Sequence, residues 1–361
     1  MNVYIYCAGH KGIVLRDKLR DEYNIDVKGF LDTYKKVEFE GNVIYNLRDV
    51  KETDAIVIAN SNHKTVVEIV ELLKKNGKYN IFWHLDFVYS SIVNRDFFKN
   101  ECVSCDEWGD CVIPHLEYHI VDNCNLNCAG CTHFSPLFEG TEESFESKIK
   151  SIDLLLEKFT CIAGIDVLGG EPLLSEKLDM YLIELRKKLP NSFINLFTNG
   201  LLIPRMTEDT FKIIRDNNIF ISITEYKPTH NMIEKIIGVL EREQIPYTST
   251  GYNSRDLFNV PISTNPKSIY PQKCISRGCF TLADGKIALC PTLMYVNKFN
   301  KFYNENLPIE GIINLNSNMS GDEILNELEK EVPLCKHCIE KPMEWHVCDK
   351  KRSISEFAVF D

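Results

Sequence analysis

The chain has 361 residues, and its hydrophobic content of 44% and charged content of 26% are ordinary for a globular protein of two or three domains. A net charge of −11 and a pI of about 5.4 argue against a protein that binds nucleic acid through a basic face. The sequence shows neither the apolar run of a signal peptide nor a stretch of about 18 apolar residues, so we expect a cytoplasmic protein without a membrane or nucleic-acid partner.

Short apolar runs alternate with helical patterns over residues 1–90, which we expect to form the first domain. Helices are predicted around residues 13–20 and 63–75. Strands are predicted at residues 3–6, 27–32, 42–46, 55–60 and 80–84. Because strands that alternate with helices form parallel sheets, this pattern predicts a small Rossmann-like α/β domain.

The turn between the first strand and the first helix, CAGHKG, has the pattern of a glycine-rich dinucleotide turn with Cys7 in place of the first glycine. Asp32 ends the second strand, where an acidic residue often meets a ribose hydroxyl. The possible ligand-binding residues of this domain are Gly9, His10, Lys11, Gly12 and Asp32. The alternative is that His10 and Lys11 are merely solvated and that the domain only contacts another subunit or a partner.

Residues 91–115 lack a clear period and are rich in cysteine and charge, which predicts a linker between domains. The cysteines of this linker are Cys102, Cys105 and Cys111. They could hold a further metal with His115 or Cys348 as the fourth ligand, but we expect unligated thiols in a surface loop.

Strand–helix alternation resumes at residue 116 and continues to residue 268. Strands are predicted at residues 116–122, 164–168, 193–199, 219–224 and 246–250. Helices are predicted at residues 142–159, 175–188, 207–217 and 229–243. Repeated units of this kind predict an α/β barrel or partial barrel, whose chemistry lies at the carboxyl ends of its strands.

Twelve of the fourteen cysteines lie in four groups of three, in residues 102–111, 124–131, 274–290 and 335–348. A reducing cytosol disfavours disulfides, so clustering at ligand spacing points to metal or iron–sulfur sites. Cys7 and Cys161 lie alone, and we expect Cys161 to be buried at a helix end rather than to donate a hydrogen atom.

The triplet Cys124-x3-Cys128-x2-Cys131 follows directly on the first predicted strand of the barrel. Thiolates are the natural ligands of iron–sulfur clusters. Three ligands on a four-iron cluster leave one iron open to a substrate or cofactor. A zinc site that shares a fourth ligand, or three cysteines that merely pack, is the alternative reading.

Two further motifs lie at the ends of the next two strands, GGEP at residues 169–172 and TNG at residues 198–200. Both should face the same mouth as the cysteine triplet, because the carboxyl ends of parallel strands meet at one edge. The two glycines let the backbone approach a ligand closely, and the carboxylate of Glu171 suits an ammonium group.

The motifs CNLNCAGC, GGEP and TNG, in this order and at strand ends, resemble the radical SAM superfamily over about residues 116–265. The resemblance implies a partial (β/α)6 barrel of TIM type that holds a [4Fe-4S] cluster on Cys124, Cys128 and Cys131 and S-adenosylmethionine (SAM) on the open iron. An electron from a donor such as flavodoxin or ferredoxin would cleave SAM, and the resulting 5′-deoxyadenosyl radical would abstract hydrogen from a substrate.

The resemblance also implies which residues hold SAM. The GGEP segment would receive its amino group, and Thr198 and Asn199 would lie beside its nucleoside. Many members carry an aromatic residue just before the last cysteine, where this chain has Gly130, so we expect Phe134 to pack against the adenine. The implied SAM-binding residues are Gly169, Gly170, Glu171, Pro172, Thr198, Asn199 and Phe134.

Residues 269–361 change in character and form the last predicted region. The Asp-Gly pair at residues 284–285 lies between two short alternating strands, which is a strong hairpin signal, and a helix is predicted at residues 321–331. Cys279 and Cys290 flank the turn and should face each other, with Cβ atoms about 4.5–5.5 Å apart.

A second cluster is predicted in this last region. The spacing Cys274-x10-Gly285-x4-Cys290, followed by a late CxxC, resembles the SPASM and twitch extensions of radical SAM enzymes, which carry auxiliary clusters. The cysteines are too few for two complete four-ligand clusters, so we expect one auxiliary [4Fe-4S] cluster. Its four ligands would come from Cys274, Cys279, Cys290, Cys335 and Cys338, with the choice between Cys274 and Cys279 left open. A structural zinc ribbon is the alternative.

Residues 1–85 resemble the N-terminal nucleotide-sugar-binding domain of bacterial sugar acyltransferases, through VYIYCAGHKG and VKGFLD. Chains that continue from the triplet as CTHFSPL does here look like products of surface-polysaccharide genes. These resemblances imply oxidation or epimerisation of a sugar or nucleotide sugar, although the sequence identifies no hydrogen donor. The alternatives are a peptide-modifying radical SAM enzyme, which the first domain disfavours, and a catalytically silent binding protein that keeps its cluster.

Overall fold

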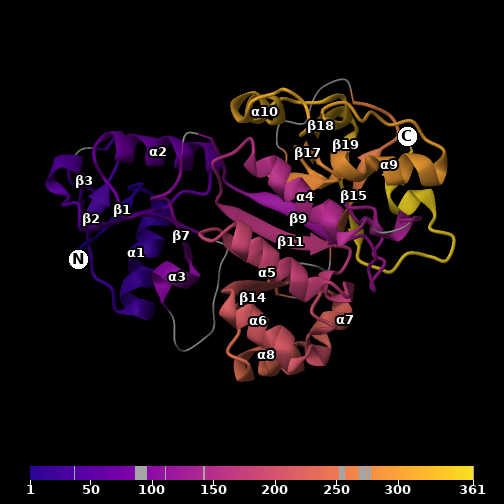
Figure 1. Ribbon diagram of the computed structural model, residues 1–361, viewed down its shortest axis with the longest axis horizontal. Helices are drawn as coiled ribbons and strands as arrows, with labels where there is room; N and C mark the ends of the chain where they lie inside the picture. The colour runs from indigo at the N-terminus through magenta and orange to yellow at the C-terminus, as the bar shows by residue number, and fades with distance from the viewer. Residues whose placement is uncertain are drawn as a thin grey trace.

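The computed structural model describes residues 1–35, 37–85, 96–109, 111–140, 143–251, 257–267, 274 and 278–360. An N-terminal α/β domain, a central sheet with its helices and a C-terminal part lie side by side (Figure 1). No helix in these ranges has the length and apolar character that crossing a membrane requires.

The N-terminal domain is built on a five-stranded sheet in the order β2-β1-β5-β6-β7, parallel except for the last strand. Its strands are β1 Val3–Tyr6, β2 Val27–Leu31, β5 Ala55–Ile58, β6 Ile81–His84 and β7 Cys102–Ser104. Its helices are α1 His10–Tyr23, α2 His63–Lys75 and α3 Phe97–Asn100. The parallel α/β arrangement is the one that strand–helix alternation predicts.

The strand predicted at residues 42–46 is much shorter in the structure. Only Asn42–Val43 (β4) is extended, and it pairs with Glu38–Phe39 (β3) in a small hairpin. Glu40 and Gly41 turn between them, with φ angles of 48° and 74°. Directly after β4, Ile44 forms an isolated parallel bridge with Phe30 of β2, so the chain touches the edge of the main sheet without adding a full strand to it.

Part of the predicted linker belongs to the folded body. β7 closes the N-terminal sheet, and β8 Val112–Ile113 pairs with β10 Cys161–Ile162. The expectation that Cys161 lies at a helix end is therefore wrong, because it is a strand residue.

The three cysteines of this region do not form a common site. Cys102 and Cys105 are buried, so the expectation of surface-loop thiols is wrong for both. Cys102, Cys105 and Cys111 each pack in a different hydrophobic cluster. Residues three apart on an extended chain point to opposite faces of a sheet, so the thiols of Cys102 and Cys105 cannot share one metal ion.

The central sheet has eight strands in the order β14-β13-β12-β11-β9-β16-β17-β18. Five parallel strands run from β14 to β9, and β16 adds a sixth parallel strand on the other side of β9. The strands are β9 Leu116–Val121, β11 Gly164–Gly169, β12 Phe193–Thr198, β13 Ile219–Ile223, β14 Tyr247–Ser249, β16 Phe280–Ala283, β17 Lys286–Ala288 and β18 Ile313–Asn314. The fold is thus mixed α/β with parallel sheets, consistent with a radical-SAM-type partial barrel.

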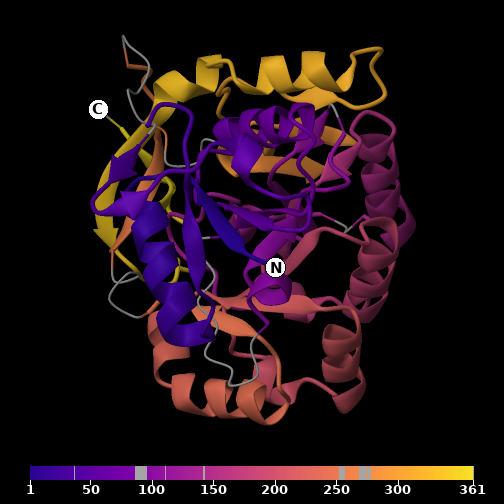
Figure 2. The same ribbon diagram turned by 90° about the vertical axis from the view of Figure 1, so that its left-hand side faces the viewer.

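Helices lie in an arc outside the central sheet (Figure 2). They are α4 Phe145–Leu156, α5 Leu178–Lys188, α6 Glu208–Asp216, α7 Lys227–His230 and α8 Ile233–Arg242. The single helix predicted at residues 229–243 is therefore divided between α7 and α8. The hydroxyls of Ser144 and Thr207 accept hydrogen bonds from the first turns of α4 and α6, which fixes where these helices begin.

The C-terminal part covers the central sheet at its β16–β18 side. Its helices are α9 Pro291–Tyr303 and α10 Gly321–Leu328. A separate sheet places β15 Leu257–Ser263 between β19 Cys338–Glu344 and β20 Ala358–Val359. Short 3-10 turns are Leu47–Asp49, Ser135–Leu137, Pro172–Leu174, Ile203–Arg205, Pro333–His337 and Ile354–Glu356.

The predicted Asp-Gly hairpin is confirmed. Ala283 pairs with Lys286, which leaves a two-residue loop of Asp284 and Gly285 with φ angles of 52° and 66°. These positive φ values are those of a type I′ turn, whose twist matches that of the flanking strands.

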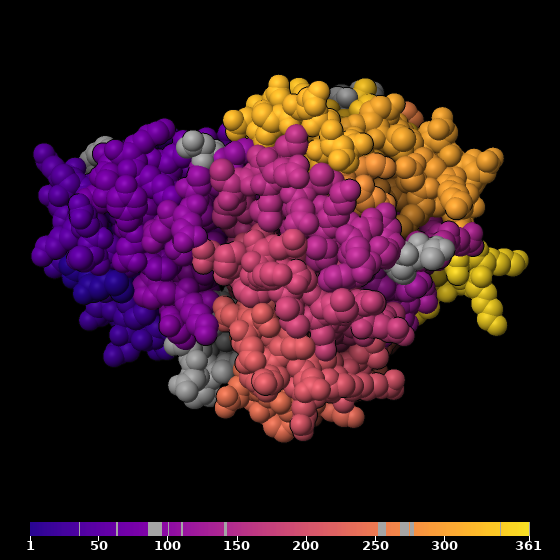
Figure 3. Space-filling model, viewed as in Figure 1, coloured from indigo at the N-terminus to yellow at the C-terminus, as the bar shows by residue number. Residues whose placement is uncertain are grey.

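The N-terminal domain is in direct contact with the central part of the molecule (Figure 3), and its apolar cluster includes residues at the amino ends of the central strands. Phe193 and Phe220, near the starts of β12 and β13, belong to the same apolar cluster as Trp83 and Trp108. The carboxyl ends of the parallel strands therefore lie on the side away from the N-terminal domain.

The hairpin turn and helix α8 provide a matched pair of glycine substitutions. Gly285→Ala should lower the free energy of unfolding by about 1–2 kcal/mol, because a Cβ is strained at a φ of 66°. Gly238→Ala should raise it by up to about 1 kcal/mol, because Gly238 lies within α8 with no atom near the added methyl group. Urea denaturation of both variants measures the difference, and equal effects would contradict the turn geometry.

Candidate functional site

The cysteine triplet lines a cavity of about 380 Å³ at the carboxyl ends of the central strands. The GGEP and TNG segments form the neighbouring walls. The predicted residues that line this cavity are Cys124, Cys128, Cys131, Gly169, Gly170, Glu171, Thr198 and Asn199. Pro172 is buried at the start of the following 3-10 turn and is not one of the lining residues.

The two glycines of GGEP are required by packing within the protein. A Cβ on Gly169 would collide with the carbonyl oxygen of Val121, and a Cβ on Gly170 would collide with that of Asn123. The backbone amide of Gly170 donates a 2.8 Å hydrogen bond to the Val121 carbonyl, and that of Glu171 donates a 2.9 Å bond to the Asn123 carbonyl. The glycines thus let the end of β11 lie directly against the chain that leads into Cys124.

The carboxylate of Glu171 joins the ends of β11 and β12. One oxygen, Oε1, accepts hydrogen bonds from the Thr198 hydroxyl at 2.6 Å and from the Leu173 amide at 3.1 Å. The other oxygen, Oε2, accepts one from the Asn199 amide at 2.8 Å. The side chain is 1% exposed, and this burial raises its pKa to about 7 despite the three donors. The group expected to meet an ammonium ion is therefore already held by three protein donors.

Asn199 extends this connection to the cysteine loop. Its side-chain Nδ2 donates a 2.7 Å hydrogen bond to the side-chain Oδ1 of Asn125, and its backbone carbonyl accepts one of 2.6 Å from the Thr229 hydroxyl. The three sequence motifs and the start of α7 are thus one hydrogen-bonded unit.

The Cys131 thiol differs from the other two. Burial alone would raise its pKa, but a hydrogen bond with His133 outweighs this effect and lowers the pKa to about 7. Burial would lower the pKa of His133, yet its contacts with Cys131 and Glu117 raise it to about 9. For Cys124 burial is dominant and raises the pKa to about 11. The contact with His133 therefore favours the thiolate of Cys131, the form of a thiol that binds metal.

The spread of the three sulfur atoms argues against a single zinc ion. In the described part of the chain, one group of three His, Cys, Asp or Glu residues has all its ligand atoms within 4.8 Å, and it is Glu117, His119 and His133. The sulfurs of the triplet are therefore farther apart than the ligands of one tetrahedral zinc, whose Zn–S bonds are about 2.3 Å. A wider polynuclear cluster fits this donor set better.

The end of the chain covers the cysteine loop. The indole Nε1 of Trp345 donates a 3.1 Å hydrogen bond to the Cys128 sulfur. The backbone amide of Ala129 donates to the His346 carbonyl at 3.0 Å, and that of Cys348 donates to the Asn127 carbonyl at 2.9 Å. A segment more than 200 residues distant in sequence thus forms part of the wall around the triplet.

Phe134 does not line the cavity, so the expectation that it packs against adenine is wrong. It is fully buried and contacts Phe299 and Phe357, with ring centroids 5.7 and 6.2 Å away. Gly130 cannot carry the aromatic side chain found in similar proteins, because even a Cβ there would lie 2.7 Å from the Asn259 carbonyl oxygen. The aromatic residues that do line the cavity are Phe197, Tyr226 and Phe258.

Sequence reasoning missed a polar wall of the same cavity, which Glu117, His133 and Asp166 form. His115 Nε2 lies 3.1 Å from the carboxylate of Asp166. Glu117 and Asp166 are acidic residues within strands whose other residues are mostly apolar. The presence of a carboxylate in such a strand is the sequence signal that would have identified them. A charged residue inside such a strand needs a partner or a ligand.

The C-terminal cysteines gather beside this site, and the structure distinguishes among them. Burial raises the pKa of the Cys290 and Cys338 thiols, and the nearby thiols of Cys274 and Cys335 raise both further. Cys279 instead lies near Glu117 and Asp166, which together with burial raise its pKa to about 12. The described strand pairs end at Thr281 and Ala288, so the expected pairing of Cys279 with Cys290 stays a prediction.

In the N-terminal turn, Asp32 is occupied by the protein itself. Its carboxylate accepts hydrogen bonds from the backbone amides of Ala8, Tyr34 and Lys35 at 2.9–3.0 Å. Lys11 Nζ donates a 2.6 Å hydrogen bond to the hydroxyl of Ser61. Around Gly9 there is open space, whereas a Cβ on Gly12 would collide with the Cys7 carbonyl. His10 is exposed at the start of α1.

Comparison with known proteins relates the central part of the chain to one superfamily. The profile of the Radical SAM superfamily matches residues 118–245. A GTP 3',8-cyclase of Clostridium acetobutylicum is 33% identical over 104 residues, which is 28% of this chain and 31% of that protein. The chain thus spans about a third of the length of such curated relatives.

Two solved structures match parts of the chain at low similarity. BtrN in complex with AdoMet and 2-DOIA has a TM-score of 0.39 at 16% identity, over 64% of this chain and 94% of that chain. The anSMEcpe protein with bound AdoMet has a TM-score of 0.32 at 19% identity, over 38% of this chain and 43% of that chain.

The Glu171 carboxyl should make stability depend on pH. Burial raises its pKa from 4.5 to about 7, so it binds its proton more tightly in the folded protein than in the unfolded chain. Folding then takes up a proton between these pH values, and the free energy of unfolding should fall as the pH rises through this window, by at most about 3 kcal/mol. Urea denaturation of cluster-free protein at several pH values measures this fall.

Two variants assign the effect to Glu171. Glu171→Gln should flatten the pH dependence in this window, because the titrating group is removed. Thr198→Val should move the upper end of the window to higher pH, because the Thr198 hydroxyl lowers the pKa of the carboxyl. An unchanged slope in Glu171→Gln would assign the pH dependence to another group.

Proposed function

Because the profile of the Radical SAM superfamily matches residues 118–245, we propose that this chain is an enzyme that reductively cleaves SAM. The observation that carries the proposal is the single cavity lined by the triplet, GGEP and TNG. A [4Fe-4S] cluster with SAM would supply a 5′-deoxyadenosyl radical that abstracts hydrogen from the substrate. Three thiols with one half-ionised member are a suitable donor set for such a cluster.

The residues around the cavity have separable roles in this proposal. Cys124, Cys128 and Cys131 hold the cluster. Glu171 acts first as a positioning residue, because it fixes the ends of β11 and β12 on which the SAM-binding backbone lies. The aromatic rings of Tyr226 and Phe258 take the role that the sequence suggested for Phe134, since they line the cavity and Phe134 does not.

A sugar, or a nucleotide sugar, is the substrate class we propose. The polar wall of Glu117, His133 and Asp166 supports it, because hydroxyl groups need hydrogen-bonding partners inside a cavity. Oxidation or epimerisation of one carbon would follow hydrogen abstraction, with a flavodoxin- or ferredoxin-type donor supplying the electron. The parallel α/β sheet of the N-terminal domain favours this class over the peptide substrates of the alternative.

The N-terminal domain would then have a role apart from the reaction cavity. It packs at the amino ends of the central strands, and none of its residues is among those that line the cavity. Gly9, His10, Lys11 and Gly12 could hold the phosphates of a nucleotide sugar at the start of α1. Backbone amides already hold both oxygens of the Asp32 carboxylate, so a ribose hydroxyl would have to share this group with them.

We also propose one auxiliary [4Fe-4S] cluster, on Cys274, Cys290, Cys335 and Cys338. The thiols of Cys274 and Cys335 lie close enough to raise the pKa of both Cys290 and Cys338, and Cys279 is not among the groups that do so, which supports Cys274 as the fourth ligand. Cys279 lies near the carboxylates of Glu117 and Asp166, which line the triplet cavity. An auxiliary cluster would suit a net oxidation, because it can accept the electron left on the substrate.

SAM cleavage is the direct test of the enzyme. After anaerobic reconstitution with iron and sulfide, the protein should convert SAM to 5′-deoxyadenosine and methionine when dithionite is added. Cys128→Ala should abolish 5′-deoxyadenosine, whereas Cys161→Ala should retain it, because Cys161 in β10 packs against the apolar cluster of the N-terminal domain and does not line the cavity. Chromatography measures both products, and wild-type protein with a loaded cluster but no product would refute the proposal.

Iron content tests the auxiliary cluster separately. A variant with Cys124, Cys128 and Cys131 replaced by Ala should keep about four irons per chain after reconstitution. Adding Cys274→Ala should remove this iron, whereas adding Cys279→Ala should not. Near-zero iron in the first variant would exclude the auxiliary cluster, and loss with Cys279→Ala alone would reverse the choice of ligand.

A further inference from the structure

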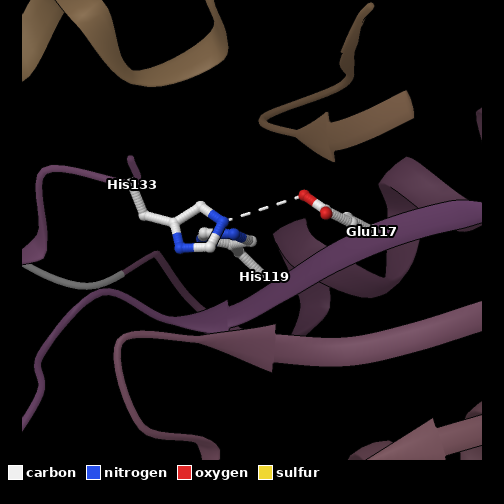
Figure 4. Close-up of side chains that lie close together, drawn as sticks. All are labelled: Glu117, His119 and His133. Atoms are coloured by element: carbon white, nitrogen blue, oxygen red, sulfur yellow. Dashed lines mark ion pairs between the residues drawn. The ribbon is translucent and has the colours of Figure 1, made fainter. Parts of the chain in front are cut away.

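Glu117, His119 and His133 meet at the wall of the triplet cavity (Figure 4). Their ligand atoms, one from each side chain, all lie within 4.8 Å of one another. His133 Nε2 is 3.7 Å from the Glu117 carboxylate, the contact drawn as a dashed line in Figure 4. Two imidazoles and one carboxylate are a donor set typical of divalent transition metals.

The fold explains why these three side chains converge. Glu117 and His119 are two residues apart on β9, so their side chains leave the same face of the sheet. His133 comes from the loop that follows Cys131 and reaches back over that face (Figure 4). Two ligands therefore come from one face of a strand and the third from a loop, so other coordination positions of a bound metal ion would remain free of protein ligands.

The nitrogen atoms of this group provide an independent sign of a ligand. His119 is only 3% exposed, yet neither of its ring nitrogens has a hydrogen-bond partner in the described structure. His133 Nε2 is also buried and has no hydrogen-bond partner, and its contact with Glu117 is an ion pair at 3.7 Å. A metal ion bound at this nitrogen would displace its proton. Buried polar atoms are rarely left unsatisfied in native proteins, because desolvation without a partner is costly. A bound metal ion would satisfy one nitrogen of each ring.

Neighbouring side chains hold two of the three ligands in place. The Thr281 hydroxyl donates a 3.2 Å hydrogen bond to Glu117 Oε2. The ring of Tyr295 stacks on His119 with centroids 4.4 Å apart and planes 26° from parallel. Outer partners of this kind fix the orientation of metal ligands and are typical of built metal sites.

We propose that Glu117, His119 and His133 bind one divalent first-row transition metal ion, Zn²⁺ or Fe²⁺, apart from the iron–sulfur clusters. The site borders two cavities, because Glu117 and His133 line the triplet cavity and His119 lines a neighbouring cavity of about 320 Å³. A metal there has open coordination positions for a substrate oxygen. It would orient a hydroxyl group and promote its deprotonation beside the reacting centre.

Cobalt binding tests this site without SAM and without turnover. Co²⁺ replaces both Zn²⁺ and Fe²⁺ in such sites, and it is not a component of the iron–sulfur clusters. Protein with its clusters already loaded is equilibrated anaerobically with Co²⁺, and bound cobalt and iron are counted by mass spectrometry. Wild-type protein should bind about one Co²⁺ per chain. No cobalt in the wild-type protein at saturating concentration would overturn the proposal.

Substitutions locate the ion. Loss of outer partners weakens metal binding about 10- to 100-fold, so loss of a direct ligand in Glu117→Gln or His119→Gln should weaken it by at least about 100-fold. Thr281→Val removes the hydroxyl that contacts both Glu117 Oε2 and the Cys279 carbonyl, and should weaken binding by about tenfold. His230→Gln is the matched control, because His230 also pairs with a glutamate, Glu225, but has no second histidine; it should bind as the wild type does.

The iron count in the same samples separates loss of the site from loss of the fold. A variant that loses cobalt and keeps its cluster iron supports the proposal. Undiminished cobalt binding by both Glu117→Gln and His119→Gln would overturn it, since the ion would then lie elsewhere. Because no step uses SAM, failure of this test leaves the proposed radical chemistry unaffected, and failure of SAM cleavage leaves the metal site unaffected.

Discussion

The buried carboxylate of Glu171 is the interaction on which the site depends. It accepts the Thr198 hydroxyl and the Asn199 amide from the end of β12 while its own backbone lies at the end of β11. The side chain is only 1% exposed, so three protein donors stabilise the carboxylate, and burial still raises its pKa to about 7. A group with this environment holds two strand ends at a fixed separation, because any displacement would leave a charged oxygen unsatisfied.

The cysteine loop is attached to this pair of strand ends from two directions. Gly169 and Gly170 allow the β11 end to lie against residues 121–123, and Asn199 reaches Asn125 inside the CNLNCAGC segment. The C-terminal segment then closes the outer side through Trp345 and Cys128. The loop that would hold the cluster is therefore ordered by the protein on three sides, which is the preorganisation that a reactive site requires.

The two ends of the central sheet have different neighbours. The N-terminal domain covers the amino ends through an aromatic cluster that includes Trp83 and Phe220, while the cavity opens at the carboxyl ends. The residues that surround the cavity come from the central strands, the triplet loop and the β15 region. Substrate selection should therefore be sought in this wall and in the C-terminal part, with the first domain in a supporting role.

Much of the secondary structure could be predicted from sequence, because strands buried on both faces read as continuous apolar runs and are separated by helical periods. The Asp284-Gly285 turn was predictable for a similar local reason, since few residues tolerate two positive φ angles. Predictions failed where a residue's surroundings come from distant segments. Phe134 is buried by Phe299 and Phe357, and Cys102 and Cys105 by two separate clusters, none of which a local pattern reports.

The sequence by itself determined the ligand chemistry: three cysteines at a fixed spacing after a strand, followed by two motifs at the next strand ends. Their order along the chain is sufficient, because parallel strands bring successive carboxyl ends to one edge. Only the tertiary structure decided which side chains complete the site. The direction of each side chain and its contacts with distant residues decide three points. One is whether Glu171 is hydrogen-bonded within the protein, and another is which cysteine lies by Cys290. The third is whether Glu117 and His119 meet His133. These are set by packing, which spacing in the sequence does not encode.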